Sequence, residues 1–249
     1  MTVKNRIGLS AAALSLLCLM PIAARADHKA IQGRTGLPAV RVGGDKVKIE
    51  YGVVQMNVSG HSMVTTQTYR LHYPGPPLET GRRQIKIAVR EDYYRSTDNG
   101  APKVTPGEAK GFTRFSVSMD GRRIPSTTEP WRLNTREDTA TRWRTWTVNF
   151  SPGQIRRMRI VSRAPLGREA NRQYVQFVSQ DLSRWRGAPN YLEIRFSAPG
   201  RAEARLAALE PRPNNINPNA VQWVYRNARP HRDIYLQMPL GYGQMAYGR

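Results

Sequence analysis

From residue 40 onward, apolar and polar side chains alternate in short segments that end at turn residues. A period of two is typical of β-strands that bury one face. The clearest segments are residues 69–73, 85–89, 146–150, 192–196 and 221–225. About eleven strands are expected in this way, with one short helix at residues 202–209. The pattern predicts an all-β chain folded as an antiparallel β-sandwich.

Turn chemistry adds two local predictions. Asp120-Gly121 follows an alternating segment and predicts a two-residue hairpin turn, because both residue types tolerate positive φ. The alternation in residues 47–51 changes phase after Gly52, which predicts a β-bulge there.

The N-terminus has the features of a secretion signal. Lys4 and Arg6 precede an apolar run over residues 7–22, and Ala24-Arg25-Ala26 fits a signal peptidase site. A retained membrane anchor is the alternative, although the run is shorter than a bilayer span. The expected divisions are a signal peptide at 1–26, a flexible leader at 27–37, a β-sandwich domain at 38–165, a second β unit or continuation of the sandwich at 166–238, and a disordered Gly/Tyr tail at 239–249.

Cysteine and histidine usage narrows the possible chemistry. Cys18, the single cysteine, lies inside the predicted signal, so the mature chain is expected to lack disulfides and thiolate sites. The four histidines are scattered, and the chain carries no motif of a serine hydrolase, a zinc protease or a phosphate-binding loop. We therefore expect no catalytic residue, no metal site and no cofactor.

Acidic doublets are the remaining candidates for catalysis. Glu91-Asp92 and Glu137-Asp138 are the densest acidic positions. Neighbouring strand residues point to opposite faces, so neither doublet alone forms the facing pair of a glycosidase. We expect these acids to pair with arginines. A secreted glycan-active hydrolase with carboxylates from separate strands stays open as an alternative.

Positive charge is the property furthest from average. Lys and Arg number 39 against 18 Asp and Glu, which gives a net charge of +21, and only 7 of the basic residues are lysine. Arginine-rich coding explains the ratio of Arg to Lys but leaves the excess of charge unexplained. Arginine binds carboxylate, phosphate or sulfate through two donors at once. The excess therefore predicts an anionic partner.

Several arginine clusters are candidates for this role. On a strand, Arg142 and Arg144 share one face, as do Arg157, Arg159 and Arg163, and another pair follows the predicted hairpin turn at residues 122–123. The residues assigned to anionic-ligand binding are Arg142, Trp143, Arg144, Arg156, Arg157, Arg159, Arg184, Trp185 and Arg186.

The tryptophans divide into two predicted groups. Trp146 and Trp223 keep phase with apolar neighbours and are expected in the core. Trp143 and Trp185 each stand between two arginines and are expected to be exposed.

Two different sequence units stand out in the second half: an aromatic strand, a Trp-x-Gly turn and a strand, and later a Trp-x-aromatic segment followed by Asn, Pro and Asp-Ile. The first unit joins Tyr174-Val175-Gln176-Phe177, Ser183-Arg184-Trp185-Arg186-Gly187 and Leu192-Glu193-Ile194, and the second joins Trp223-Val224-Tyr225-Arg226-Asn227, Pro230 and Asp233-Ile234. Over about residues 112–238 the chain resembles exported bacterial β-sandwich proteins of unknown function. That resemblance implies a secretion signal and β-sandwich architecture, and it implies no activity. Arginine stands beside Trp185 where those proteins usually carry lysine.

These features together predict an exported, non-enzymatic binding or structural protein of the cell envelope, periplasmic or extracellular. Its arginine-rich face would engage anionic polymers, namely lipopolysaccharide, phospholipid headgroups or acidic glycans. Export disfavours nucleic acid, and no transmembrane segment is expected in the mature chain. Besides the hydrolase, the other alternative is a subunit of an envelope protein assembly, in which the basic face meets an acidic protein partner.

Overall fold

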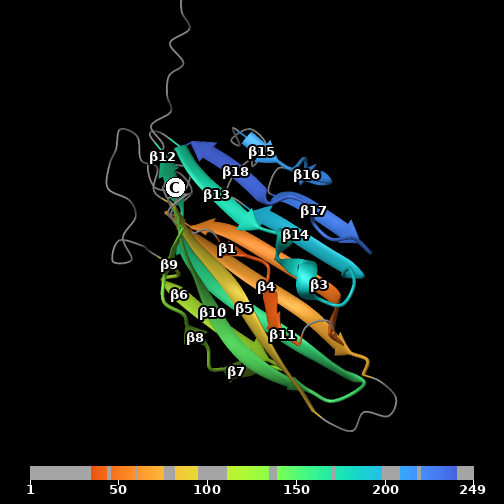
Figure 1. Cartoon of the computed structure of the whole chain (residues 1–249). Coiled ribbons are helices and arrows are strands. Elements are labelled where there is room, and N and C mark those ends of the chain that lie inside the picture. Colours follow the sequence, from red (N-terminus) through yellow and green to blue (C-terminus); the bar gives the residue numbers. More distant parts are fainter. Residues whose placement is uncertain are drawn as a thin grey trace, which may run out of the picture.

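The computed structural model describes residues 35–43, 46–59, 61–75, 82–94, 111–134, 139–169, 172–197, 208–217 and 220–239. These residues form eighteen β-strands and one short 3-10 helix, η3 (Gln180–Arg184), so the all-β prediction is confirmed (Figure 1). Within these ranges no helix is long and apolar enough to cross a membrane. The predicted signal peptide, the doublet Glu137-Asp138 and the tail from residue 240 lie outside the described residues.

The largest sheet has eight strands in the order β16-β17-β14-β3-β4-β11-β6-β7. Its strands are β3 (Lys48–Ser59), β4 (Ser62–Tyr73), β6 (Arg114–Met119), β7 (Arg122–Ile124), β11 (Gln154–Pro165), β14 (Tyr191–Ser197), β16 (Asn215–Asn217) and β17 (Ala220–Arg226). Every neighbouring pair is antiparallel except β14 beside β3, which is parallel. Strands from before and after residue 165 therefore share one sheet.

Two smaller sheets of five strands each complete the fold. One contains β2 (Ala39–Val42), β5 (Arg83–Tyr94), β8 (Thr127–Thr128), β9 (Arg132–Asn134) and β10 (Thr139–Phe150). The other contains β1 (Thr35–Gly36), β12 (Gly167–Glu169), β13 (Arg172–Val178), β15 (Ala208–Glu210) and β18 (Ile234–Pro239). Strands β5 and β10 pair over their whole length of twelve residues and form the longest strand pair of their sheet.

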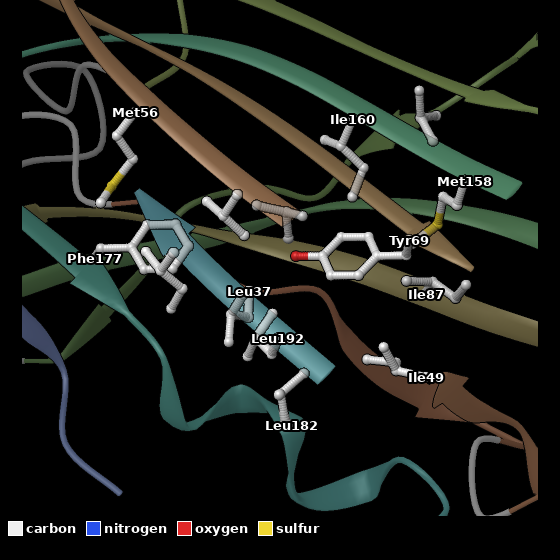
Figure 2. Close-up of a cluster of buried hydrophobic side chains, with 14 of the residues drawn as sticks. Leu37, Ile49, Met56, Tyr69, Ile87, Met158, Ile160, Phe177, Leu182 and Leu192 are labelled. Carbon is white, nitrogen blue, oxygen red and sulfur yellow. The ribbon is translucent and has the colours of Figure 1, made fainter. Parts of the chain in front are cut away.

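One hydrophobic core joins the three sheets. Ile87 of β5, Phe177 of β13 and Leu192 of β14 are completely buried and belong to the same cluster as Tyr69 of β4. Figure 2 shows these side chains meeting between the sheets. Because apolar burial is the main favourable term in folding, this shared cluster couples the sheets energetically.

A buried polar contact ties the first described strand to the large sheet. The Tyr69 hydroxyl donates to Oε1 of Gln67 at 2.6 Å, and Nε2 of Gln67 donates to the carbonyl of Gly36 at 3.0 Å. Burial raises the pKa of Tyr69, which keeps its hydroxyl protonated as a donor. The Tyr69 hydroxyl and the Gln67 side-chain amide are therefore both hydrogen-bonded inside the core.

The predicted hairpin turn and the predicted β-bulge are both present, but the bulge lies at a different position. Asp120 and Gly121 have φ of 52° and 81° and join β6 to β7, as a tight hairpin turn requires. The bulge in β3 is real but lies before Gly52, because the register passes from Ile49 opposite Leu71 to Tyr51 opposite Arg70. Tyr51 is consequently 45% exposed instead of sharing the buried face of Ile49.

The structure differs from the sequence-based expectations at three places. The last part of the predicted flexible leader, residues 35–37, is ordered and buried: Thr35–Gly36 pairs in parallel with β13, and Leu37 fills the core. Residues 202–207 of the predicted helix lie outside the described residues, and the last two, Ala208 and Leu209, belong to β15, because they pair with β18. Pro239, the first residue of the predicted tail, is the last residue of β18.

Gly36 tests the anchoring of β1. A Cβ at this position would lie 2.7 Å from Cβ and from the carbonyl oxygen of Val178, so Gly36→Val must push β1 away from β13. We expect the free energy of unfolding to fall by about 1–3 kcal/mol in urea denaturation. The control is Val42→Ala on the same segment, where the side chain is 60% exposed. Equal stability of the two variants would show that β1 is not anchored.

Candidate anion-binding site

Strand β11 separates an apolar inner face from a basic outer face. Met158 and Ile160 are completely buried, so the period of two directs Arg157, Arg159 and Arg163 outward. All three arginines are exposed. The predicted sharing of one face by these residues is confirmed.

Neighbouring strands extend this basic surface. Arg114 of β6 lies directly opposite Arg163, and Ser118 of β6 lies between Arg159 and Arg123 of β7 in the strand register. Strands β11, β6 and β7 are hydrogen-bonded neighbours at the edge of the large sheet (Figure 1). We call Arg114, Arg123, Arg157, Arg159 and Arg163 the outer arginine face.

The five guanidinium groups of the outer arginine face have no acidic partner among the described residues. Among the described residues none of the five arginines forms an ion pair. The nearby Asp120 is already used, since Oδ1 accepts the backbone N–H of Arg157 at 2.8 Å and Oδ2 binds Nε of Arg156 at 2.7 Å. Like charges directly opposite each other destabilise a sheet, so Arg114 and Arg163 carry a cost that a bound anion would remove.

A hollow of about 470 Å³ adjoins the outer arginine face where β7 ends and the chain crosses to β8. It is lined by Phe115, Ser116, Arg123, Ile124, Pro125 and Ser126. We call it the β7 hollow. It combines one guanidinium, two hydroxyls and apolar atoms, a mixture suited to a small polar ligand with one negative charge.

A second hollow, of about 410 Å³, also contacts Ile124 and contains Arg82, Gln154 and Arg156. Here the candidate Arg156 is occupied, because it donates to Asp120 and, at 2.9 Å, to the carbonyl of Asn149. Its side chain lies on the opposite face of β11 from Arg157. Arg156 is therefore a structural link between turns more than a free anion site.

Arg142 and Arg144 also have a partner. Both lie on the side of β10 that faces the interior, in line with the buried Trp146, and both bind Glu91 of β5. Arg142 reaches the carboxylate with Nε at 3.0 Å and NH2 at 2.8 Å, and Arg144 reaches it with Nε at 2.5 Å. Both residues were assigned to anionic-ligand binding from the sequence, and in the structure Glu91 engages both guanidinium groups.

The Glu91 cluster is closed by the segment that precedes β6. The Phe112 N–H donates to Glu91 at 2.8 Å, and the Trp131 ring covers the Arg142 guanidinium at 4.3 Å. Gly111 is required here, because a Cβ would lie 1.8 Å from Oε2 of Glu91. Since Glu91 is only 1% exposed, this Arg-Glu-Arg group is an internal brace of the sandwich end.

The other acid of the doublet is paired as well. Asp92 points to the opposite face of β5, is 1% exposed, and accepts from Arg90 Nε at 2.6 Å and from the Thr141 hydroxyl at 2.7 Å. The prediction that this doublet partners arginines is confirmed. In the part of the chain that the structure describes, no three His, Cys, Asp or Glu side chains gather in a way that could hold a metal ion.

The remaining predicted residues lie away from the outer arginine face. Trp143 is half-buried with Arg41 4.7 Å from its ring centre. Trp185 is only 3% exposed, and its Nε1–H donates to the carbonyl of Pro38 at 2.8 Å, so its predicted exposure is wrong. Arg184, the last residue of η3, and Arg186, two residues later, are exposed. Trp146 and Trp223 are in the core, as predicted.

Sequence reasoning assigned Arg157 and Arg159 to the site but left out Arg114, Arg123 and the serines of the β7 hollow. Arg123 was visible as part of a basic pair. Arg114 has no such signal, because only the pairing of β6 with β11 places it opposite Arg163. Register between strands distant in sequence is what the pattern could not supply.

No protein-family model and no curated protein sequence matches the chain. Among solved structures, a supposed nutrient binding protein from Legionella pneumophila is similar with a TM-score of 0.60 and 11% identity, over 88% of this chain and 75% of that one. At this identity the likeness shows the fold alone. A zinc metallopeptidase of the M1 type from Deinococcus radiodurans has a TM-score of 0.36 at 10% identity, over 81% of this chain and 43% of the enzyme. A TM-score this low carries no argument about activity.

The two Arg-Trp-Arg segments can be compared directly. Trp185→Ala removes a buried ring and should lower the free energy of unfolding by about 3–5 kcal/mol. Trp143→Ala removes a half-buried ring and one cation–π contact, and should cost about 1–2 kcal/mol. Urea denaturation of both variants measures the difference. Similar losses would contradict the placement of Trp185 in the core.

Glu91→Gln tests the internal brace. The substitution keeps the shape of the side chain but leaves Arg142 and Arg144 partly buried without a counter-charge. We expect a loss of about 3–5 kcal/mol in unfolding free energy. Glu50→Gln, which weakens an ion pair with the 58% exposed Arg70 side chain, is the control and should cost less than about 1 kcal/mol. A small effect at Glu91 would mean that the cluster is not structural.

Proposed function

We propose that the protein is an exported, non-enzymatic binding protein whose outer arginine face holds anionic polymers of the cell envelope. The observation that carries the proposal is the gathering of five exposed arginines on three neighbouring strands without an ion-pair partner among the described residues. Such a surface attracts polyanions strongly and in a salt-dependent way.

The shape of this surface favours an extended ligand. Arg157, Arg159 and Arg163 follow one strand, with successive outward positions about 6.6 Å apart, and Arg114 and Arg123 lie on the strands beside it. A repeating anion can meet several of these groups at once, so modest single contacts add up along the chain. The guanidinium groups bind sulfate, phosphate and carboxylate alike, which leaves the polymer class to be fixed by other contacts.

The fold relative described as a nutrient binding protein is consistent with a binding role, but the proposal depends on the arginines and not on that likeness. The hydrolase alternative has less support. Glu91 and Asp92 are both engaged by arginines inside the protein, so neither is available as a general acid or nucleophile.

Charge reversal tests the outer arginine face. The triple variant Arg157→Glu, Arg159→Glu, Arg163→Glu should elute from a dextran sulfate resin at much lower salt than the wild type. The slope of log K against log salt should fall by about two to three, since three contacts are lost. The variant should stay folded, because Arg163→Glu replaces repulsion of Arg114 by attraction.

The matched control is Arg184→Glu, Arg186→Glu, Arg212→Glu. These arginines are exposed and outside the outer arginine face, and the change in net charge is the same. We expect only a small shift in elution. If both triple variants shift equally, total charge and not this face determines retention, and the assignment is wrong.

A further inference from the structure

We propose that the β7 hollow is a subsite for one carboxylate-bearing sugar unit, so that the polymer is an acidic glycan containing uronate residues. This inference rests on the proposed function and gives its ligand a chemical class. It starts from the position of Arg123, which belongs both to the outer arginine face and to the lining of the hollow. A polymer lying on the face can therefore place one unit in the hollow.

The lining of the hollow matches a sugar better than a lipid or an inorganic ion. Ser116 and Ser126 offer two hydroxyls that can both donate and accept, as sugar hydroxyls require. Ile124 and Pro125 offer apolar surface for the C–H groups of a ring. Its volume of about 470 Å³ is in the range of small-molecule sites and far exceeds the needs of a bare anion.

The charge of the hollow favours a carboxylate. Arg123 is the one basic residue among the described residues that line the hollow, and its cross-strand neighbour Ser118 is neutral. One planar guanidinium can meet one carboxylate through two parallel hydrogen bonds. A phosphate monoester carries nearly two negative charges and would draw on more than one cation.

The ring of Phe115 does not provide a stacking platform. One face packs on Phe112 with ring centres 5.5 Å apart, and the ring also contacts Trp146 at 6.0 Å and the Arg144 guanidinium at 5.9 Å. The ring is thus packed against three groups of the protein. The hollow is therefore a poor site for a nucleobase, which would need an open aromatic face.

The test compares polygalacturonate, dextran sulfate, poly-L-glutamate and single-stranded DNA on the full chain by calorimetric titration at fixed salt. The double variant Ser116→Ala, Ser126→Ala removes only the two hydroxyls of the hollow. We expect polygalacturonate to bind about tenfold more weakly, the effect of losing two hydrogen bonds, while dextran sulfate binding is unchanged. The matched control Thr147→Ala, Ser151→Ala removes two hydroxyls from the second hollow and should change neither affinity.

The outcomes separate the two proposals. Unchanged polygalacturonate binding by the Ser116→Ala, Ser126→Ala variant overturns the subsite, as does equal wild-type affinity for poly-L-glutamate and polygalacturonate or a preference for single-stranded DNA. In those cases loss of dextran sulfate binding in the β11 triple variant would still support the outer arginine face. If the triple variant binds every polymer as the wild type does, the proposed function itself fails.

Discussion

The rest of the structure depends on the alternation of buried side chains with partly or fully exposed ones along β4 and from Arg157 onward in β11. On the inner side these strands supply Tyr69, Met158 and Ile160 to the core shared by all three sheets. On the outer side the same alternation leaves positions that packing does not restrict. The arginines of β11 occupy those positions, so the basic surface is held rigidly by the core beneath it, with no loop needed to position it.

The two kinds of arginine in this protein illustrate how burial decides a role. Arg142 and Arg144 lie on an inward face, where an unpaired charge would be very costly, and there Glu91 meets both. Arg157, Arg159 and Arg163 lie on an outward face, where water solvates a lone charge at little cost. The same residue type in the same kind of strand is therefore a brace in one sheet and a candidate ligand contact in another.

Local chemistry made much of the fold predictable. The hairpin at Asp120-Gly121, the core positions of Trp146 and Trp223 and the pairing of Glu91-Asp92 with arginines all follow from neighbours along the chain or from general costs of burial. Trp185 was misplaced because its hydrogen-bond partner, Pro38, is remote in sequence. Arg114 was missed for a similar reason, since its place opposite Arg163 depends on register. Contacts between distant segments are the part that one sequence does not reveal.

The parallel pairing of β14 with β3 has a consequence for how the chain reaches its native state. Tyr191 meets Tyr51 and Ser197 meets Asn57, so the centre of the large sheet is closed by residues roughly 140 positions apart. Closing such a long loop is entropically expensive and slow compared with forming hairpins. Until β14 pairs with β3, the β3–β4 hairpin keeps the β3 edge open. An open strand edge is a template for pairing with other chains, so the partly folded protein is prone to aggregation until this parallel pair forms.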